Sequence, residues 1–152
     1  MLKIWGRLSS INVRKVVLAA RWLAIPFQRI DAGHEFGMVD TPEYRARNPN
    51  GLVPLIEDDG FVLWESNVIV RYLCAKHSAG TFYPQALAAR FDAECWMDWQ
   101  QTTLNPAGRG AFQEPNTTAG LPAHASSAQS RSVVSVSLAI CSPWNLPALL
   151  LA

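Results

Sequence analysis

Charged side chains almost disappear from the chain after residue 112, and this break limits how much of it can fold as an ordinary globular domain. Of the 25 charged residues among 152, 23 lie in residues 1–112, and only Glu114 and Arg131 follow. Fourteen of the fifteen aromatic residues also precede residue 113, whereas seven of the eleven serines follow it. A domain needs both a patterned apolar core and a charged surface, so we look for the fold within residues 1–112.

The composition of the whole chain excludes several classes of protein. A net charge of +1 offers no strongly basic surface for nucleic acid or for an anionic membrane. No stretch of about 18 apolar residues could span a bilayer, and the N-terminus lacks the residue order of a signal peptide. The three cysteines, Cys74, Cys95 and Cys141, are widely spaced, which is typical of a reducing compartment without a disulfide framework. We therefore expect a cytoplasmic protein that binds neither nucleic acid nor a membrane.

The first thirty residues predict a strand, a helix and a second strand. Residues 2–5 alternate apolar and polar side chains, as a half-buried strand does. Apolar residues then recur at helical spacing over residues 12–24, and Pro26 stops that helix. Residues 27–30 form the second strand. Such a unit joins two parallel strands by a right-handed crossover.

The next stretch predicts another helix, a hairpin and a further helix. Thr41 and Pro42 supply a hydroxyl cap and a proline at the first helical position, and residues 48–51 stop that helix. Two strands, residues 52–56 and 61–64, flank an Asp-Asp-Gly turn signal. A helix with an apolar stripe follows the second of them. The order of elements is therefore βαβ, a connecting helix, and ββα.

Two motifs at a fixed separation identify a family. The run Asn-Pro-Asn-Gly-Leu-Val-Pro-Leu-Ile over residues 48–56, followed by Leu-Trp-Glu-Ser-Asn-Val-Ile-Val-Arg-Tyr-Leu over residues 63–73, resembles the N-terminal domain of a soluble glutathione S-transferase. The resemblance covers residues 1–78 and continues through residues 87–112. Residues 5–13 are similar to those of bacterial members that use serine rather than tyrosine or cysteine.

The resemblance implies an α/β fold class. It implies a thioredoxin-like βαβ-α-ββα domain over residues 1–78, a linker over residues 79–86, and the first part of an all-helical domain over residues 87–112. Residues 113–152 do not resemble the family, and many are Ala, Ser, Thr or Pro. We expect this tail to be disordered or non-native, from a gene that is truncated or frameshifted after about residue 112.

The Val53–Pro54 pair predicts a backbone site for an extended ligand. A bond preceding proline can adopt the cis isomer at modest cost. That isomer turns the N–H and C=O of Val53 outward, where they can bind a peptide as an added strand. The residues alone also fit an ordinary edge-strand proline. The resemblance implies that Val53 and Pro54 bind the cysteinyl part of glutathione.

Glu65 and Ser66 stand where a strand ends and a helix begins. A helix N-terminus offers free N–H groups and a partial positive charge to a carboxylate. The Ser66 hydroxyl can add a hydrogen bond, and Glu65 can bind an ammonium group. The alternative is a capped helix start with no ligand. The resemblance implies that the γ-glutamyl end of glutathione binds here.

Ser10 precedes the first helix and is the candidate for thiol activation. A free thiol has a pKa of about 8.5 and is mostly protonated at pH 7, so lowering that pKa is the catalytic task. The Ser10 hydroxyl can donate a hydrogen bond to the thiolate, and Asn12 is a second polar candidate. Ser9 competes for the role, and Ser10 could instead serve only as a helix cap. No cysteine precedes Cys74, which argues against glutaredoxin-like or cysteine-type transferase chemistry.

The glycyl end of glutathione is less well provided for. Many relatives carry Lys or Arg just before the Val-Pro pair, where this chain has Leu52. Asn50 and His34 are the candidates that could hold the glycyl carboxylate instead.

In the second domain, residues 96–106 resemble the first helix of bacterial transferases, which lines the dimer interface and the electrophile pocket. Asp98 there is a further candidate for a ligand amine across a dimer.

The resemblance implies a glutathione S-transferase of the detoxification type. The enzyme would bind glutathione as co-substrate, use no metal, add the thiolate to a small hydrophobic electrophile, and form a homodimer. One alternative is a non-catalytic or degenerate glutathione-binding protein that lacks most of the helical domain. Another is a thioredoxin-like interaction module that keeps the fold without the ligand.

Overall fold

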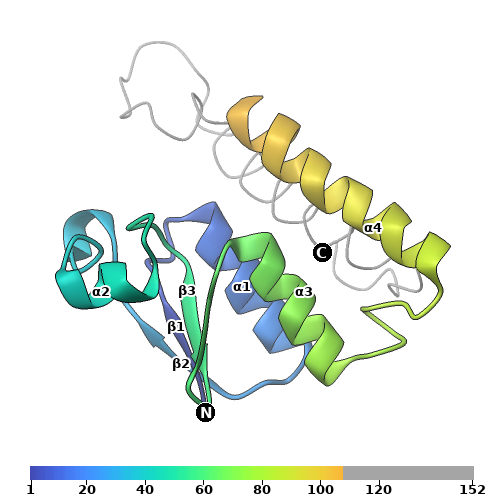
Figure 1. The fold of residues 1–152 in the computed structure, drawn as a ribbon, viewed down its shortest axis with the longest axis horizontal. Coiled ribbons are helices and arrows are strands. Elements are labelled where there is room, and N and C mark those ends of the chain that lie inside the picture. The colour runs from blue at the N-terminus through green and yellow to red at the C-terminus, as the bar shows by residue number, and fades with distance from the viewer. Residues whose placement is uncertain (108–152) are drawn as a thin grey trace, which may run out of the picture. The chain divides into compact units, whose positions relative to one another are not determined.

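The computed structural model describes residues 1–107 of the chain. These residues belong to two compact units that divide between Tyr83 and Pro84. The first unit is built of strands and helices, whereas the described part of the second is helical (Figure 1). The residues that the sequence nominated for glutathione lie in the first unit, and Asp98, the candidate for a ligand amine across a dimer, lies in α4 (Leu87–Trp99) of the second.

A mixed four-stranded sheet forms the centre of the first unit. Its strands are β1 (Leu2–Trp5), β2 (Phe27–Ile30), β3 (Leu55–Asp58) and β4 (Phe61–Trp64), in the spatial order β2-β1-β3-β4. β1 and β2 are parallel, β3 runs antiparallel to β1, and β4 runs antiparallel to β3. The predicted βαβ-α-ββα order and the thioredoxin-like fold class are confirmed.

Helices cover the two faces of this sheet. The crossover helix α1 (Ile11–Trp22) and the C-terminal helix α3 (Ser66–His77) pack against each other, and Figure 1 shows them side by side. The sides of both helices that face the sheet are buried, and so are Ile4 of β1 and Ile56 of β3. Because side chains alternate along a strand, the neighbouring residues point to the opposite face.

The opposite face is closed by α2 (Pro42–Arg47) and the loop before it. Tyr44 of α2 packs in a buried cluster with Trp5, Ala32 and Leu55. The Arg47 guanidinium lies 4.2 Å from the centre of the Trp5 ring and contacts the carboxylate of Glu57. Aromatic burial with a cation on the ring face fixes this short helix on the sheet.

The predicted boundaries hold with small shifts. Thr41 accepts a hydrogen bond from the Tyr44 N–H, and Pro42 is the first residue of α2, as the sequence indicated. The strand expected over residues 52–56 begins only at Leu55, because the Leu52 carbonyl bonds to side chains near α2. A short 3-10 turn, His34–Phe36, lies in the loop between β2 and α2.

In the second unit, α4 (Leu87–Trp99) continues into a π-helical turn, Gln100–Leu104, so the start of a helical domain that the resemblance implied is present. Several of its apolar side chains are exposed, and the rings of Trp96 and Trp99 meet edge to face. The expectations for residues 113–152 fall outside the described residues.

Two searches of residues 1–107 found nothing. None of their helices combines the length and the apolar character that crossing a bilayer requires. In the same range, no three His, Cys, Asp or Glu side chains gather closely enough to hold a metal ion.

Candidate functional site

Three segments of the chain leave the sheet at one edge, and together they carry most of the predicted site residues. Trp5, the last residue of β1, pairs with Leu55, the first residue of β3. Leu55 in turn pairs with Trp64, the last residue of β4. The residues that follow Trp5, precede Leu55 and follow Trp64 therefore start from the same edge. These segments contain, respectively, Ser10 and Asn12, then Asn50, Val53 and Pro54, then Glu65 and Ser66.

Close packing brings the loop after β1 against Val53. Gly6 has a φ of +150°, and a side-chain carbon placed on it would lie 2.4 Å from Val13 and 3.3 Å from the Val53 Cβ. A separation of 2.4 Å is a clash, so residue 6 must lack a side chain for the loop to approach this closely. The first turn of α1 and the Val-Pro segment are thereby held together.

The Val53–Pro54 bond is cis, the isomer that the sequence analysis considered for it. Pro54 is buried and Val53 is half-buried. The pairing of β3 starts at Leu55, so the N–H and C=O of Val53 lie outside the ladder that joins β1, β3 and β4. An extended ligand could pair with these two groups as an added strand.

The carbonyl of Leu52, immediately before Val53, accepts two hydrogen bonds from protein side chains. The Tyr44 hydroxyl and the Asn48 amide each donate to it at 2.8 Å. The Asn48 oxygen also accepts the N–H of Asn50 at 3.1 Å. Burial raises the pKa of Tyr44 to about 12, which keeps its hydroxyl protonated at neutral pH. In the sequence, Asn48 belongs to a helix stop and to the family motif, and nothing indicates this contact of Tyr44.

Glu65 adopts a backbone conformation that side chains disfavour. Its φ is +72° and its ψ is 107°, whereas ordinary residues rarely occupy positive φ. Glu65 precedes α3, yet within the described residues its exposed side chain makes no capping hydrogen bond to that helix. Backbone strain of this kind costs about 1–3 kcal/mol and is concentrated at functional sites.

Ser66, the first residue of α3, is buried, and its helix begins with N–H groups that have no partner four residues earlier. Lys15 of α1 is also buried, and its ammonium donates to the Asn67 side chain at the second position of α3. A helix N-terminus with a lysine beside it favours a carboxylate. The helical pattern gave no sign of Lys15, because its partner lies 52 residues away in the sequence.

Ser10 stands at the N-terminus of α1 without capping it. Its backbone has the extended conformation of a cap residue, but within residues 1–107 its side chain makes no capping hydrogen bond. Ser10 is half-buried, whereas Ser9 is exposed. In the same turn the Asn12 side-chain oxygen is buried and has no hydrogen-bond partner among the described residues. Buried polar atoms are normally paired, so an unpaired one is a place for a ligand group.

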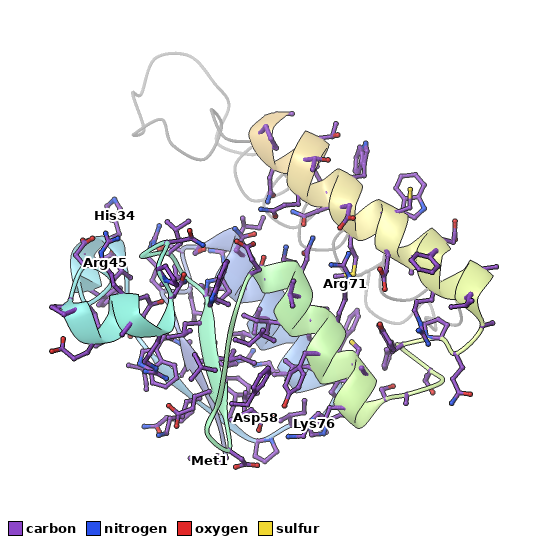
Figure 2. The ribbon with its side chains drawn as sticks, viewed as in Figure 1. Met1, His34, Arg45, Asp58, Arg71 and Lys76 are labelled. Atoms are coloured by element: carbon purple, nitrogen blue, oxygen red, sulfur yellow. The ribbon has the colours of Figure 1, made fainter. Side chains whose placement is uncertain are left out.

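The two candidates for the glycyl end, Asn50 and His34, are exposed, and so is Leu52. Asn50 bonds through its backbone to Asn48, the Leu52 side chain projects outward, and the His34 ring contacts the Glu35 carboxylate at 3.0 Å. Figure 2 shows His34 near α2.

Sequence reasoning missed Arg7 at this position. A side-chain carbon placed on Gly33 would lie 3.1 Å from the Arg7 Nη1 and 3.3 Å from the Val53 Cγ1, so these two atoms approach the same point. The place of Arg7 directly after β1, in the Trp-Gly-Arg run, was the available signal. Arg7 thus brings a positive charge to the neighbourhood of Val53.

Comparisons with known proteins agree on one family. The family model described as the N-terminal domain of glutathione S-transferase matches residues 9–76. The glutathione S-transferase GstB of Escherichia coli strain K12 is 47% identical over 112 residues, which are 72% of this chain and 54% of GstB. Rat glutathione S-transferase theta-1 is 33% identical over 105 residues, covering 68% of this chain and 44% of the relative. The chain therefore spans about half the length of these curated relatives.

A solved structure shares both fold and sequence with this chain. It is the theta class glutathione S-transferase of Xanthomonas axonopodis pv. citri with glutathione bound. The two agree with a TM-score of 0.72 and 38% identity, over 91% of this chain and 63% of the relative. With the matched motifs and the edge geometry described above, these likenesses show that the chain belongs to the glutathione S-transferase family.

Proposed function

We propose that this protein binds glutathione at the edge of the sheet and conjugates its thiolate to a small hydrophobic electrophile. The observation that carries the proposal is the meeting of three segments at one edge: the uncapped start of α1, the cis Val53–Pro54 bond, and Glu65 at positive φ before α3. The Xanthomonas relative, solved with glutathione bound, supports it. We further propose that residues 1–78 are the glutathione-binding domain, that residues 79–86 are the linker, and that residues 87–112 begin the helical domain.

Each part of glutathione would meet a different group of residues in the site. Glu65 would bind the ammonium of the γ-glutamyl group, and Ser66 with the α3 N-terminus would bind its carboxylate. The N–H and C=O of Val53 would pair with the cysteinyl backbone, with Pro54 holding that segment in place. Asn50 would contact the glycyl end, and Arg7 would supply the positive charge that Leu52 does not.

This placement directs the cysteinyl sulfur toward the start of α1. There the Ser10 hydroxyl would donate a hydrogen bond to the thiolate, helped by the partial positive charge of the helix N-terminus and by the side-chain N–H of Asn12. The thiol would lose its proton to solvent, the sulfur would form a bond to the electrophilic carbon, and a leaving group such as halide would depart with the bonding electrons. The protein contributes orientation and stabilisation of the negative charge.

The helical unit would offer apolar surface to a partner subunit. Phe91, Trp96 and Trp99 of α4 are exposed and provide apolar surface for such contacts. We propose a homodimer, which sedimentation equilibrium of the full chain would detect as a mass twice that of one chain.

Calorimetry and turnover together test this function. Reduced glutathione titrated into the full chain should bind, and the protein should speed the conjugation of glutathione to a chromogenic aryl halide above the uncatalysed rate. Binding without turnover would favour a non-catalytic glutathione-binding protein. Absence of both would leave the interaction module as the better interpretation.

A further inference from the structure

The two hydrogen bonds to the Leu52 carbonyl act on the group proposed to bind glutathione. The Leu52 C=O and the Val53 N–H belong to one peptide group, which is planar and trans, since the cis bond lies one residue later. In a trans peptide group the N–H points away from the C=O. A carbonyl held in one direction therefore holds the Val53 N–H in the opposite direction.

Tyr44 and Asn48 are themselves rigidly held. Tyr44 is 3% exposed and Asn48 is 2% exposed, and both donate to the Leu52 oxygen at 2.8 Å. Tyr44 packs in the cluster with Trp5 and Leu55, at the sheet edge where the site begins. The Asn48 side-chain oxygen is occupied by the Asn50 N–H, so its amide group cannot turn without breaking a bond.

Two donors on one carbonyl also change the strength of the N–H on the other side. Hydrogen bonds accepted by a carbonyl polarise its peptide group, which makes the N–H a better donor. One donor would satisfy a buried carbonyl, whereas two from different directions fix its orientation as well. The Leu52 side chain is 63% exposed and adds no packing that would do this instead.

We propose that Tyr44 and Asn48 are positioning residues that aim the Val53 N–H at the cysteinyl carbonyl of glutathione. The proposal rests on the proposed function, since it needs glutathione to pair with Val53. Neither residue touches the ligand in this scheme. They act through the Leu52–Val53 peptide group.

The chain offers a matched pair of tyrosines for the test. Tyr44→Phe removes the hydroxyl that bonds Leu52, and Tyr72→Phe removes a hydroxyl that bonds Asp58, also at 2.8 Å, at the opposite end of the sheet. Each variant deletes one oxygen atom and leaves the ring. Calorimetry with reduced glutathione should show Tyr44→Phe binding roughly three- to tenfold more weakly, with Tyr72→Phe unchanged. In turnover assays Tyr44→Phe should raise KM for glutathione and keep kcat at saturation.

Asn48→Asp provides a second variant. Its carboxylate can still accept the Asn50 N–H, but it presents an oxygen instead of a donor to the Leu52 carbonyl. We expect a loss of affinity of tenfold or more, since a favourable contact becomes repulsive. Should Asn48→Asp fail to fold, Tyr44→Phe decides alone.

The outcomes separate this inference from the function beneath it. If wild type binds glutathione and Tyr44→Phe binds equally well, the inference is overturned while the function stands. Equal weakening by Tyr72→Phe would overturn it too, because general loss of stability would then explain both. If wild type does not bind glutathione, the proposed function fails and takes this inference with it.

Discussion

The two ends of the β3–β4 hairpin differ in how their polar groups are hydrogen-bonded. At the turn end, the buried Asp58 carboxylate accepts hydrogen bonds from the Tyr72 hydroxyl and the Lys76 ammonium at 2.8 Å and 2.6 Å. Beside it the terminal amine of Met1 contacts Asp59 at 2.8 Å. Figure 2 shows Asp58, Lys76 and Met1 gathered at this end.

At the other end, by contrast, three polar side chains of the proposed site lack a capping bond or a hydrogen-bond partner among the described residues. Within residues 1–107, the Ser10 side chain caps no helix, the Asn12 oxygen is buried without a hydrogen bond, and the Glu65 side chain makes no cap. Glu65 also carries positive φ. Charged and polar groups at the turn end bond to one another and stabilise the fold, whereas we propose that those at the edge with Val53 serve a ligand at a cost in stability.

Removing the Ser10 hydroxyl should give the largest effect at the site end. Ser10→Ala should lower kcat by about a hundredfold, since one lost donor to a developing anion costs about that much. The melting temperature should hardly change, because the hydroxyl caps nothing. Ser9→Ala is the matched control and should keep wild-type turnover; the reverse result would move the role to Ser9.

At the turn end, Asp58→Ala should act on stability and not on glutathione. It leaves the Tyr72 hydroxyl and Lys76 without their shared acceptor, at a cost of about 2 kcal/mol in the free energy of unfolding. The figure is moderate because Lys76 is partly in solvent. Urea unfolding followed by fluorescence measures it, and an altered glutathione affinity would contradict the contrast between the two ends.

The same carboxylate gives a pH dependence. Burial would raise the pKa of Asp58, but the hydrogen bonds from Lys76 and Tyr72 outweigh it and the pKa is lowered overall. Its stabilising contribution is therefore present above the unfolded value of 3.8 and is lost as pH falls through the folded one. Wild type should lose more stability than Asp58→Ala between pH 5 and pH 2. Parallel curves for the two proteins would show that Asp58 is not the group responsible.

Glu65→Gly should separate stability from binding at one position. Glycine adopts positive φ without strain, so the free energy of unfolding should rise by about 1 kcal/mol. The affinity for glutathione should fall at the same time, because the carboxylate for its ammonium is gone. A variant that binds glutathione as wild type does would remove Glu65 from the site. Glu43→Gly, an exposed position in the first turn of α2, serves as a control without this gain.

Arg7→Gln should give the smallest change. Affinity for glutathione should fall roughly threefold at low salt, and the difference should shrink as salt screens the charge. Calorimetry at two salt concentrations measures both. A salt-independent loss would mean that Arg7 acts by packing against Gly33 rather than by charge.

Local patterns in the sequence predicted the elements well. The Thr41–Pro42 helix start, the Asp-Asp-Gly turn and the Val53–Pro54 cis bond depend on neighbouring residues, and each is present. The order of elements followed, and with the family resemblance it gave the fold class. The tail over residues 113–152 lies outside the described part of the chain.

What the sequence did not reveal depends on residues brought together by folding. Tyr44 was an unremarked position in a short helix until its hydroxyl met the Leu52 carbonyl. Lys15 would be solvated on an isolated helix and is buried because Asn67 receives it. Nothing in the letters around Glu65 requires positive φ, since the turn from β4 into α3 imposes it.

The missing side chain at Gly6 has a consequence for the chemistry. In the proposed complex, one cysteine residue of glutathione must reach both the Val53 backbone and the Ser10 hydroxyl, and its covalent bonds fix the span it can bridge. Gly6 sets the matching span in the protein, because any added carbon would meet Val13 and separate the two loops. A substitution there would leave each loop able to hold its own part of the ligand, yet no single cysteine could satisfy both at once.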